Sequence, residues 1–399
     1  MITILAVIYV VFISLGLPDS LFGVAWPVVH KEFMVAESFA SLYSIITGVC
    51  TGGISLIAGT LIRKFGTPRV TLVSVILTAC GLLGVSFAPN IVVMMICTVI
   101  MGYGAGAIDT ALNNYISLHY EARHMSWLHC FWGVGVTVSP LIMSVFLNGE
   151  TGNWRVGYRV IAIIQFCIAF LVLLSLKKWL KHDKTSTNEP EQATPKTEKH
   201  SVLEVFKIKG VITSVLSQGL YCSMEFLIGT WGASFLVNSH GIAPDVAAKW
   251  VSLYFGGIMV GRLISGFISL KANDDTLIRG GIVTAFFGIL LLALPFGNIS
   301  CCGLLLIGVG FGPIFPSILH SVPERFGKEF SADLTGFHMG GAYGIGFAVQ
   351  LAFGYVATAT TFNITPYVLL TLIILLFIIN EVTLKLIKSR KSNENSVNS

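Results

Sequence analysis

Residues 91–118 read IVVMMICTVIMGYGAGAIDTALNNYISL, and Asp109 is the one charged residue in this stretch. An α-helix rises about 1.5 Å per residue, so about twenty residues cross the roughly 30 Å of hydrocarbon in a bilayer. The stretch is therefore long enough and apolar enough to span a membrane as a helix.

Apolar stretches of this kind recur from the N-terminus almost to the C-terminus. Of the 399 residues, 54% are hydrophobic and only 11% are charged, so the polar side chains are too few to coat a soluble globule of this size. We therefore predict an all-α membrane protein with twelve transmembrane helices. The predicted spans are residues 3–29, 39–62, 69–88, 91–118, 124–147, 156–180, 206–237, 246–270, 277–296, 299–320, 331–355 and 363–387.

The first predicted span is as apolar as a secretory signal but differs from one in two ways. No basic residue precedes it, and no A-x-A-like cleavage site follows in the stretch that contains Pro18, Asp19 and Trp26. We expect this segment to be retained as a helix.

The basic residues predict the orientation of the chain, because Lys and Arg near span ends are kept on the cytoplasmic side. If the N-terminus is cytoplasmic, most of the 25 Lys and Arg residues fall on the cytoplasmic side, whereas Lys31, Arg155, Arg159 and Lys249 fall on the opposite side. We expect a multi-pass protein of the cell membrane with both termini in the cytoplasm, which requires an even number of spans.

Residues 182–205 form the one long polar stretch inside the chain, and their low hydrophobicity cannot support packing. They predict a cytoplasmic linker between an N-terminal six-helix half at 1–181 and a C-terminal six-helix half at 206–388. A disordered cytoplasmic tail is expected at 389–399. This layout suggests two structurally repeated halves with a binding cavity between them, near the bilayer midplane.

The cysteines and basic residues exclude several other classes of site. All eight cysteines fall inside predicted spans, where they behave as small apolar side chains, and no disulfide framework or metal-ligand spacing is present. We expect neither a metal nor a cofactor. The basic residues form no stripe with interleaved aromatics, so the expected partners are the lipid bilayer and a small solute rather than nucleic acid. We expect the protein to work as a monomer.

Three acids lie deep inside predicted spans: Asp19, Asp109 and Glu225. Each costs about 2.5 to 3.5 kcal/mol to insert, and such acids usually mark an ion or substrate path, although some are structural ion-pair partners. Asp19 follows Pro18, which removes a backbone donor and loosens the helix. Asp19 is thus either a proton site or a cap of the broken helix, and both alternatives remain open.

Asp109 has a polar neighbour on its own helix. Asn113 lies four residues on, hence on the same face, and the two side chains together offer acceptors and donors to a polyhydroxylated ligand. Gly102, Gly104 and Gly106 precede them in a pattern that superficially resembles a dinucleotide-binding loop. No strand comes before this run, so close helix packing is the favoured interpretation.

The fifth predicted span contains SWLHCFWGVG at residues 126–135. His129 and Trp132 are three residues apart and can face one cavity, where they would pair a hydrogen-bonding imidazole with a ring on which a sugar face stacks. An intramembrane His can also be a packing residue whose hydrogen bonds are satisfied.

A polar stripe in the seventh predicted span consists of Gln218, Tyr221 and Glu225, at spacings of three and four. In lipid such a stripe must face inward, where it either lines a cavity or hydrogen-bonds to neighbouring helices. The same two alternatives apply to His320, His338 and Tyr343. Arg262 lies near enough to a cytoplasmic end to snorkel, and we expect it to make a structural contact.

The six-plus-six plan resembles the major facilitator superfamily, and several stretches resemble its fucose:proton symporter branch and related sugar permeases. Asp19 in PDSLFG stands where that branch has an acid in the first helix, and DTALN at residues 109–113 resembles its fourth-helix acid-Thr-Ala-Ala-Asn signature. His129 falls where relatives place a polar ligand-contacting side chain. Gly261-Arg262 and the segment 312–318 resemble the eighth-helix Gly-Arg pair and the tenth-helix Phe-Pro-x-Ile segment. The resemblance implies that Asp19 and Asp109 couple proton entry to sugar uptake.

The chain departs from that pattern at several positions. Arg63 stands where the superfamily's cytoplasmic signature normally has Asp, Pro18 replaces the first-helix Asn, and Asp109 is one methylene shorter than the fourth-helix Glu. These changes favour a substrate other than fucose. Ser139-Pro140 lacks the paired glycines that follow Gly-Pro in the antiporters, which argues against proton-driven export.

We therefore predict a secondary active transporter that imports a sugar or similar small polar metabolite by proton symport with alternating access. Asp19 and Asp109 would carry protonation. The residues predicted to contact the substrate are Asn113, Asn114, His129, Trp132, Gln218, Tyr221 and Glu225. No catalytic residue is expected.

Three alternatives are weaker. An exporter of drugs or metabolites on the same fold is suggested by the many Phe and Trp residues in the spans. An intramembrane aspartyl hydrolase would use Asp19 and Asp109 as a dyad. Such enzymes have a glycine two residues before the acid, and Gly106-Ala107-Ile108-Asp109 lacks it. A nutrient sensor would carry a longer cytoplasmic signalling domain than the linker and tail provide.

Overall fold

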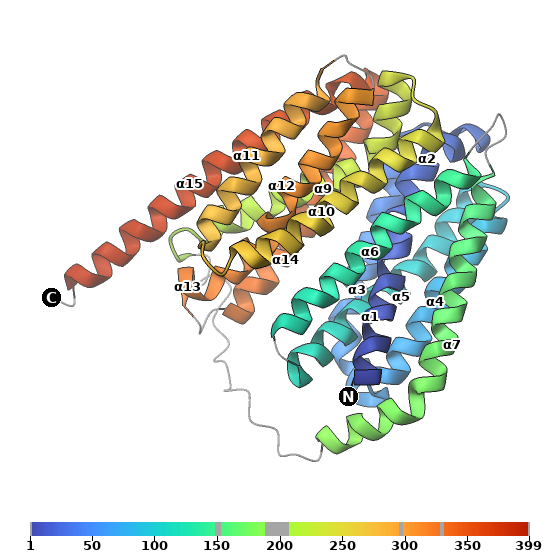
Figure 1. Ribbon diagram of the computed structural model, residues 1–399, viewed down its shortest axis with the longest axis horizontal. Helices are drawn as coiled ribbons and strands as arrows, with labels where there is room; N and C mark the ends of the chain where they lie inside the picture. Colours follow the sequence, from blue (N-terminus) through green and yellow to red (C-terminus); the bar gives the residue numbers. More distant parts are fainter. Residues whose placement is uncertain are drawn as a thin grey trace. The chain divides into compact units, whose positions relative to one another are not determined.

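The computed structural model describes residues 2–120, 122–147, 153–187, 207–294, 298–327 and 331–397, and these residues form helices and short connections without a strand. Figure 1 shows their course along the chain. In order, the main helices are α1 (Ile2–Asp19), α2 (Leu21–Glu32), α3 (Phe39–Phe65), α4 (Thr67–Phe87), α5 (Ile91–His119), α6 (Ala122–Phe146), α7 (Trp154–Thr187), α9 (Val211–His240), α10 (Pro244–Ile268), α11 (Asp274–Leu292), α12 (Asn298–His320), α14 (Ser331–Ala359) and α15 (Thr365–Val397). Two short elements, α13 (Val322–Phe326) and the 3-10 turn η1 (Phe362–Ile364), connect the last three helices.

The helices lie where the apolar stretches predict them. Within the described residues, eleven segments are long and apolar enough to cross a membrane, and the shorter apolar segment Phe39–Ser55 lies inside α3, at the second predicted span. Helix α5, for example, covers Ile91–His119 against a predicted span of 91–118. The prediction of an all-α protein with twelve membrane helices is confirmed.

Two helices run past their predicted ends. Helix α7 continues to Thr187, and α15 continues to Val397 through most of the segment predicted to be a disordered tail. Extending an existing helix needs no new nucleus, and the Lys, Arg and Glu residues beyond both spans have good helix propensity. Residues 188–205 of the predicted linker lie outside the described residues.

The chain forms two compact units. The first consists of Met1–Gln192 and Gly229–Gly256, and the second consists of Ala193–Ile228 and Gly257–Ser399. Helix α1 is central to the first unit, where it packs against α5, α6 and α7. In the second unit α11 packs along α12 and also contacts α15.

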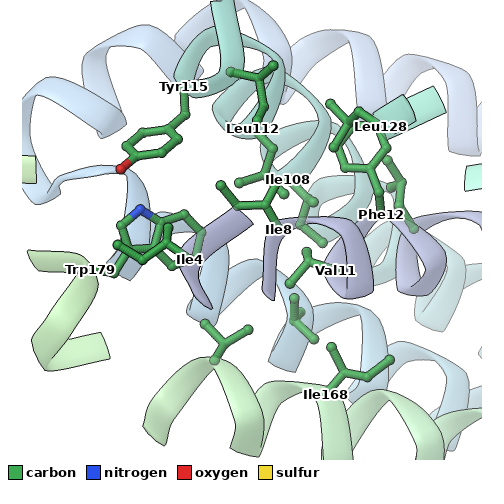
Figure 2. Close-up of a cluster of buried hydrophobic side chains, with 14 of the residues drawn as sticks. Ile4, Ile8, Val11, Phe12, Ile108, Leu112, Tyr115, Leu128, Ile168 and Trp179 are labelled. Carbon is green, nitrogen blue, oxygen red and sulfur yellow. The ribbon is translucent and has the colours of Figure 1, made fainter. Parts of the chain in front are cut away.

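The core of the first unit joins four helices around α1 (Figure 2). Ile8 and Phe12 of α1, Leu112 of α5 and Leu128 of α6 are almost completely buried together with Trp179 of α7. Burying a large apolar side chain contributes about 1.5–3 kcal/mol in water, whereas inside a bilayer close packing supplies most of the stabilisation. This core fixes the positions of α1, α5 and α6, which carry the candidate site.

Glycines set the closest helix contacts in both units. A Cβ on Gly104 of α5 would lie 2.7 Å from the carbonyl oxygen of Ser74 in α4, and one on Gly106 would lie 2.9 Å from the Cα of Thr51 in α3. The glycine run of α5 therefore serves helix packing, as its sequence context predicts. In the second unit, a Cβ on Gly261 of α10 would lie 3.1 Å from the Cα of Gly312 in α12.

Charged pairs fasten one end of α11 in the second unit. Asp274 and Asp275 lie in its first turn, where the helix dipole favours negative charge. Asp274 contacts Nδ1 of His320 at 2.7 Å, and Asp275 accepts a hydrogen bond from Arg325 at 2.7 Å. His320 thus has a carboxylate partner at a helix end.

Candidate functional site

Helices α1 and α6 cross at a pair of glycines. A Cβ on Gly16 would lie 2.9 Å from the backbone nitrogen of Val136, and one on Gly135 would lie 3.0 Å from the Cα of Gly16. Only glycine at both positions lets the two backbones approach this closely. Asp19 lies one turn after Gly16, and Trp132 lies one turn before Gly135. The crossing therefore places the acid and the indole next to each other.

Asp19 and Trp132 are joined by a hydrogen bond. The indole Nε1–H of Trp132 donates to Oδ2 of Asp19 over 2.7 Å, a length typical of a bond to a charged acceptor. The side chain of Asp19 is exposed and that of Trp132 is partly exposed, although their neighbours Pro18 and Gly133 are buried. The pair is thus held by buried backbone but presents its polar atoms at a surface.

The helix break beside Asp19 is supported by two other helices. Helix α1 ends at Asp19, and α2 begins at Leu21. Pro18 has no N–H to donate to the carbonyl of Ser14, and the side-chain amide of Gln165 in α7 donates to that oxygen instead, over 2.5 Å. The hydroxyl of Ser20 donates to the carbonyl of Val136 in α6 over 2.8 Å.

The N-cap position of α2 bears on the cap alternative for Asp19. That position is Ser20, whose side chain makes no capping hydrogen bond. Asp19 therefore does not occupy the N-cap position of α2.

Sequence reasoning missed the role of Gln165, although an amide inside an otherwise apolar span was a signal that it has a buried partner.

Asp109 and Asn113 form a pair on α5, as their spacing predicts. The amide nitrogen of Asn113 donates to Oδ1 of Asp109 over 2.7 Å and to its backbone oxygen over 3.0 Å. Both side chains are partly buried. Asn114 follows on the same helix, and its side chain lies outside the described part of the structure.

His129 lies one turn before Trp132 on α6, and both residues contact α1. The imidazole of His129 meets the ring of Phe12 edge to face, with ring centroids 5.9 Å apart. The second tryptophan of this helix, Trp127, packs edge to face on His124 instead, with centroids 5.3 Å apart.

The polar stripe of α9 lies inside the second unit. Gln218 and Tyr221 are fully buried. The amide of Gln218 reaches the sulfur of Cys222 at 3.9 Å, and the ring of Tyr221 packs edge-on against Phe311 of α12 at 5.3 Å between centroids. In this conformation both side chains are enclosed by protein.

Glu225 meets a positive charge in the same unit. Its Oε1 lies 3.9 Å from Nη2 of Arg262 on α10, and the two side chains are only 12% and 14% exposed. Arg262 therefore makes the structural contact that we expected, but it does so toward Glu225 within the unit, where the sequence suggested snorkelling to a membrane surface. The glycine contact between Gly261 and Gly312 lies beside it.

His338 and Tyr343 have different surroundings on α14. His338 is fully buried, with Nδ1 2.8 Å from the carbonyl of Leu334 and Nε2 2.9 Å from the hydroxyl of Ser214, so both ring nitrogens are satisfied. Tyr343 is 43% exposed and stacks with Phe226 and Phe347. Groups of three or more side chains suited to a metal ion are absent from the part of the chain that the structure describes.

The sequence profile of the Major Facilitator Superfamily matches residues 8–351, which is most of the chain. This protein belongs to the Major Facilitator Superfamily. The membership agrees with the all-helical fold and confirms the resemblance drawn from the sequence. It also makes the protein a multi-pass membrane transporter.

Within the superfamily, the chain is similar to a sugar transporter in sequence and to two solved transporter structures in fold. It is 22% identical over 377 residues to the glucose/mannose transporter GlcP of Bacillus subtilis, a match that covers 92% of this chain and 91% of GlcP. Its fold is similar to that of the nucleoside transporter NupG, with a TM-score of 0.76 at 14% identity over 96% of this chain and 100% of NupG. It is also similar to FucP in the outward conformation, with a TM-score of 0.62 at 15% identity over 95% and 98% of the two chains.

Proposed function

We propose that this superfamily member imports a sugar by proton symport, with Asp19 and Asp109 as the residues that carry protonation. The observation that carries the proposal is the similarity to a glucose/mannose transporter along nearly the full length of both chains. The polar residues of α1, α5 and α6 supply groups that suit such a substrate, namely two carboxylates, an amide, an imidazole and an indole ring.

The exposure of Asp19 supports a proton site. An acid inside a span cannot face hydrocarbon without a large cost, so an exposed acid at this depth borders water. The indole N–H of Trp132, which donates to it, is uncharged, so protonation of the carboxylate takes no counter-charge from this group. Protonation also makes the site neutral, which allows the loaded carrier to reorient without moving an unpaired charge through lipid.

The membrane potential supplies the driving force for uptake. One proton that moves inward releases about 2.3 kcal/mol per 100 mV. We assign the sugar contacts to the ring of Trp132, to His129 and Asn113, and to the remaining predicted residues Asn114, Gln218, Tyr221 and Glu225. Because Gln218 and Tyr221 are fully buried, contact with them requires a conformation other than this one, as alternating access provides.

The test is uptake of labelled D-glucose into proteoliposomes with an imposed inward proton gradient. The wild type should accumulate glucose and should lose accumulation when the gradient is collapsed. The variant that combines Asp19→Asn with Asp109→Asn should exchange glucose but not accumulate it. Asp245→Asn is a matched control, since Asp245 lies in the first turn of α10 and contacts Lys249 at 3.4 Å. Gradient-independent accumulation, or full coupling in the double variant, would refute the proposal.

The direction of transport separates the main alternative, an exporter on the same fold. Glucose uptake into everted membrane vesicles whose interior is more acidic than the medium would indicate export from cells.

We further propose that the protein acts as a monomer in the cell membrane with both termini in the cytoplasm. The hydrolase alternative requires two acids that share a water, whereas Asp19 accepts from Trp132 and Asp109 from Asn113.

A further inference from the structure

We propose that Trp132 couples sugar binding to the protonation of Asp19, because one indole both tethers the carboxylate through its N–H and offers its ring face to the sugar. This inference rests on the proposed function and adds a device that links its two ligands.

The tether is built into the crossing of α1 and α6. The carbonyl oxygen of Trp132 packs directly against Gly16, and the hydroxyl of Ser20 donates to Val136 on α6 over 2.8 Å. These contacts flank Asp19 and fix the backbones on both sides of it. The bond of 2.7 Å between Trp132 and Asp19 is therefore a consequence of helix packing rather than of two flexible side chains meeting at a surface.

The chemistry of the tether depends on the charge of Asp19. An indole N–H can only donate, and a hydrogen bond to a carboxylate is about twice as strong as one to a neutral acceptor. Protonation of Asp19 therefore weakens the bond and frees the ring of Trp132 to turn. A sugar that stacks on the freed ring favours the protonated acid in return, since coupling between two ligands is reciprocal.

The helices packed against α1 carry other titratable groups that bear on any pH profile. His124 and His129 lie on α6, and Asp109 lies on α5. Nδ1 of His124 is 2.7 Å from the hydroxyl of Tyr9. Tyr43 of α3 is a further group within electrostatic reach of Asp19. The variants below change Trp132 or Asp19 and leave these groups in place.

Trp132→Phe is the decisive variant, because it keeps an aromatic face and removes the N–H together with one of the two indole rings. Binding of D-glucose to purified protein in nanodiscs is measured across pH, together with gradient-independent exchange in proteoliposomes. We expect exchange to fall but to stay measurable, because the smaller ring stacks less well on the sugar. Glucose binding should become less dependent on pH, because the carboxylate no longer tethers the ring on which the sugar stacks.

Trp127→Phe is the matched control, since it makes the same change on the same helix at a residue that packs on His124. It should reproduce the wild-type pH profile. If Trp132→Phe does not fold, Asp19→Glu tests the same bond from the other side, because the longer side chain misplaces the acceptor while keeping the acid. It too should weaken the pH dependence of glucose binding.

The outcomes separate the two proposals. Glucose binding in Trp132→Phe with an unchanged pH profile would overturn the coupling role of Trp132 and leave proton symport intact. A wild-type protein that neither binds nor transports D-glucose would overturn the proposed sugar function itself.

Discussion

Each unit of this transporter holds an acid inside a membrane span, but the two acids have different partners. Asp19 in the first unit is exposed and accepts a hydrogen bond from the uncharged indole of Trp132. Glu225 in the second unit is largely buried and faces the guanidinium of Arg262. Removing the negative charge of Glu225 would take a carboxylate from the largely buried Arg262, whereas the indole that donates to Asp19 carries no charge. The difference supports our proposal that proton exchange takes place in the first unit, and it indicates a fixed ion pair in the second.

The largest predicted effect on stability tests the ion pair between Arg262 and Glu225. Arg262→Met leaves Glu225 as a buried charge without its cation, and we expect a loss of about 3–5 kcal/mol of stability. Thermal unfolding in detergent should show a lower Tm and a lower yield of folded protein. Combining it with Glu225→Gln should recover much of the loss, and Asp19→Asn should change stability far less. An Arg262→Met protein as stable as the wild type would contradict a fixed ion pair.

The next effect concerns the crossing that holds Asp19 beside Trp132. Gly135→Ala places a methyl group against the backbone of α1 and should cost about 1–3 kcal/mol by overpacking. It should also impair proton-driven accumulation, because it displaces the acid from the indole. Gly52→Ala is the control, since a Cβ there meets open space. Unaltered accumulation and Tm in Gly135→Ala would show that the close approach is dispensable.

A similar cost is expected where α7 supports the break in the first span. Gln165→Leu removes the donor to the carbonyl of Ser14 and should destabilise the protein by about 1–3 kcal/mol, the cost of a buried unsatisfied acceptor. Pro18→Ala in the same background restores a backbone N–H that can reach Ser14. Denaturation of the four proteins in this cycle should therefore show rescue in the double variant. Additive losses would rule out this role for Gln165.

The smallest predicted effect on stability concerns an exposed ion pair of the second unit, which can be compared with the buried pair of Arg262 and Glu225. Arg279 of α11 donates to both carboxylate oxygens of Glu381 on α15, at 2.6 and 2.8 Å, but the two side chains are 46% and 29% exposed. Solvent screens such a pair, so Arg279→Ala should cost at most about 1 kcal/mol. The loss should shrink further at high salt. A loss of stability as large as that of Arg262→Met would mean that burial does not determine how much these ion pairs contribute to stability.

Local sequence patterns predicted the features of this fold that depend on spacing along one helix. The apolar runs located the twelve helices, the glycines of α5 indicated helix packing, and the interval of four residues paired Asp109 with Asn113. Pro18 marked the break between α1 and α2. Each of these features follows from the helical period or from the geometry of one residue.

The contacts that define the candidate site join residues far apart in the sequence. Trp132 is 113 residues from Asp19, and Gln165 is 151 residues from Ser14. Such contacts depend on how two helices cross, which glycine positions determine only after the helices are known to be neighbours. For this reason the sequence predicted a structural contact for Arg262 but did not identify its carboxylate partner, Glu225, which lies on another helix.

The most direct measurement of the central claim is the proton movement that accompanies glucose entry. A pH-sensitive dye outside proteoliposomes should report alkalinisation when D-glucose is added to the wild type without an imposed gradient. Asp19→Asn should exchange labelled glucose while producing no alkalinisation. An Asp19→Asn protein that alkalinises the medium as the wild type does would contradict the assignment of proton exchange to this residue.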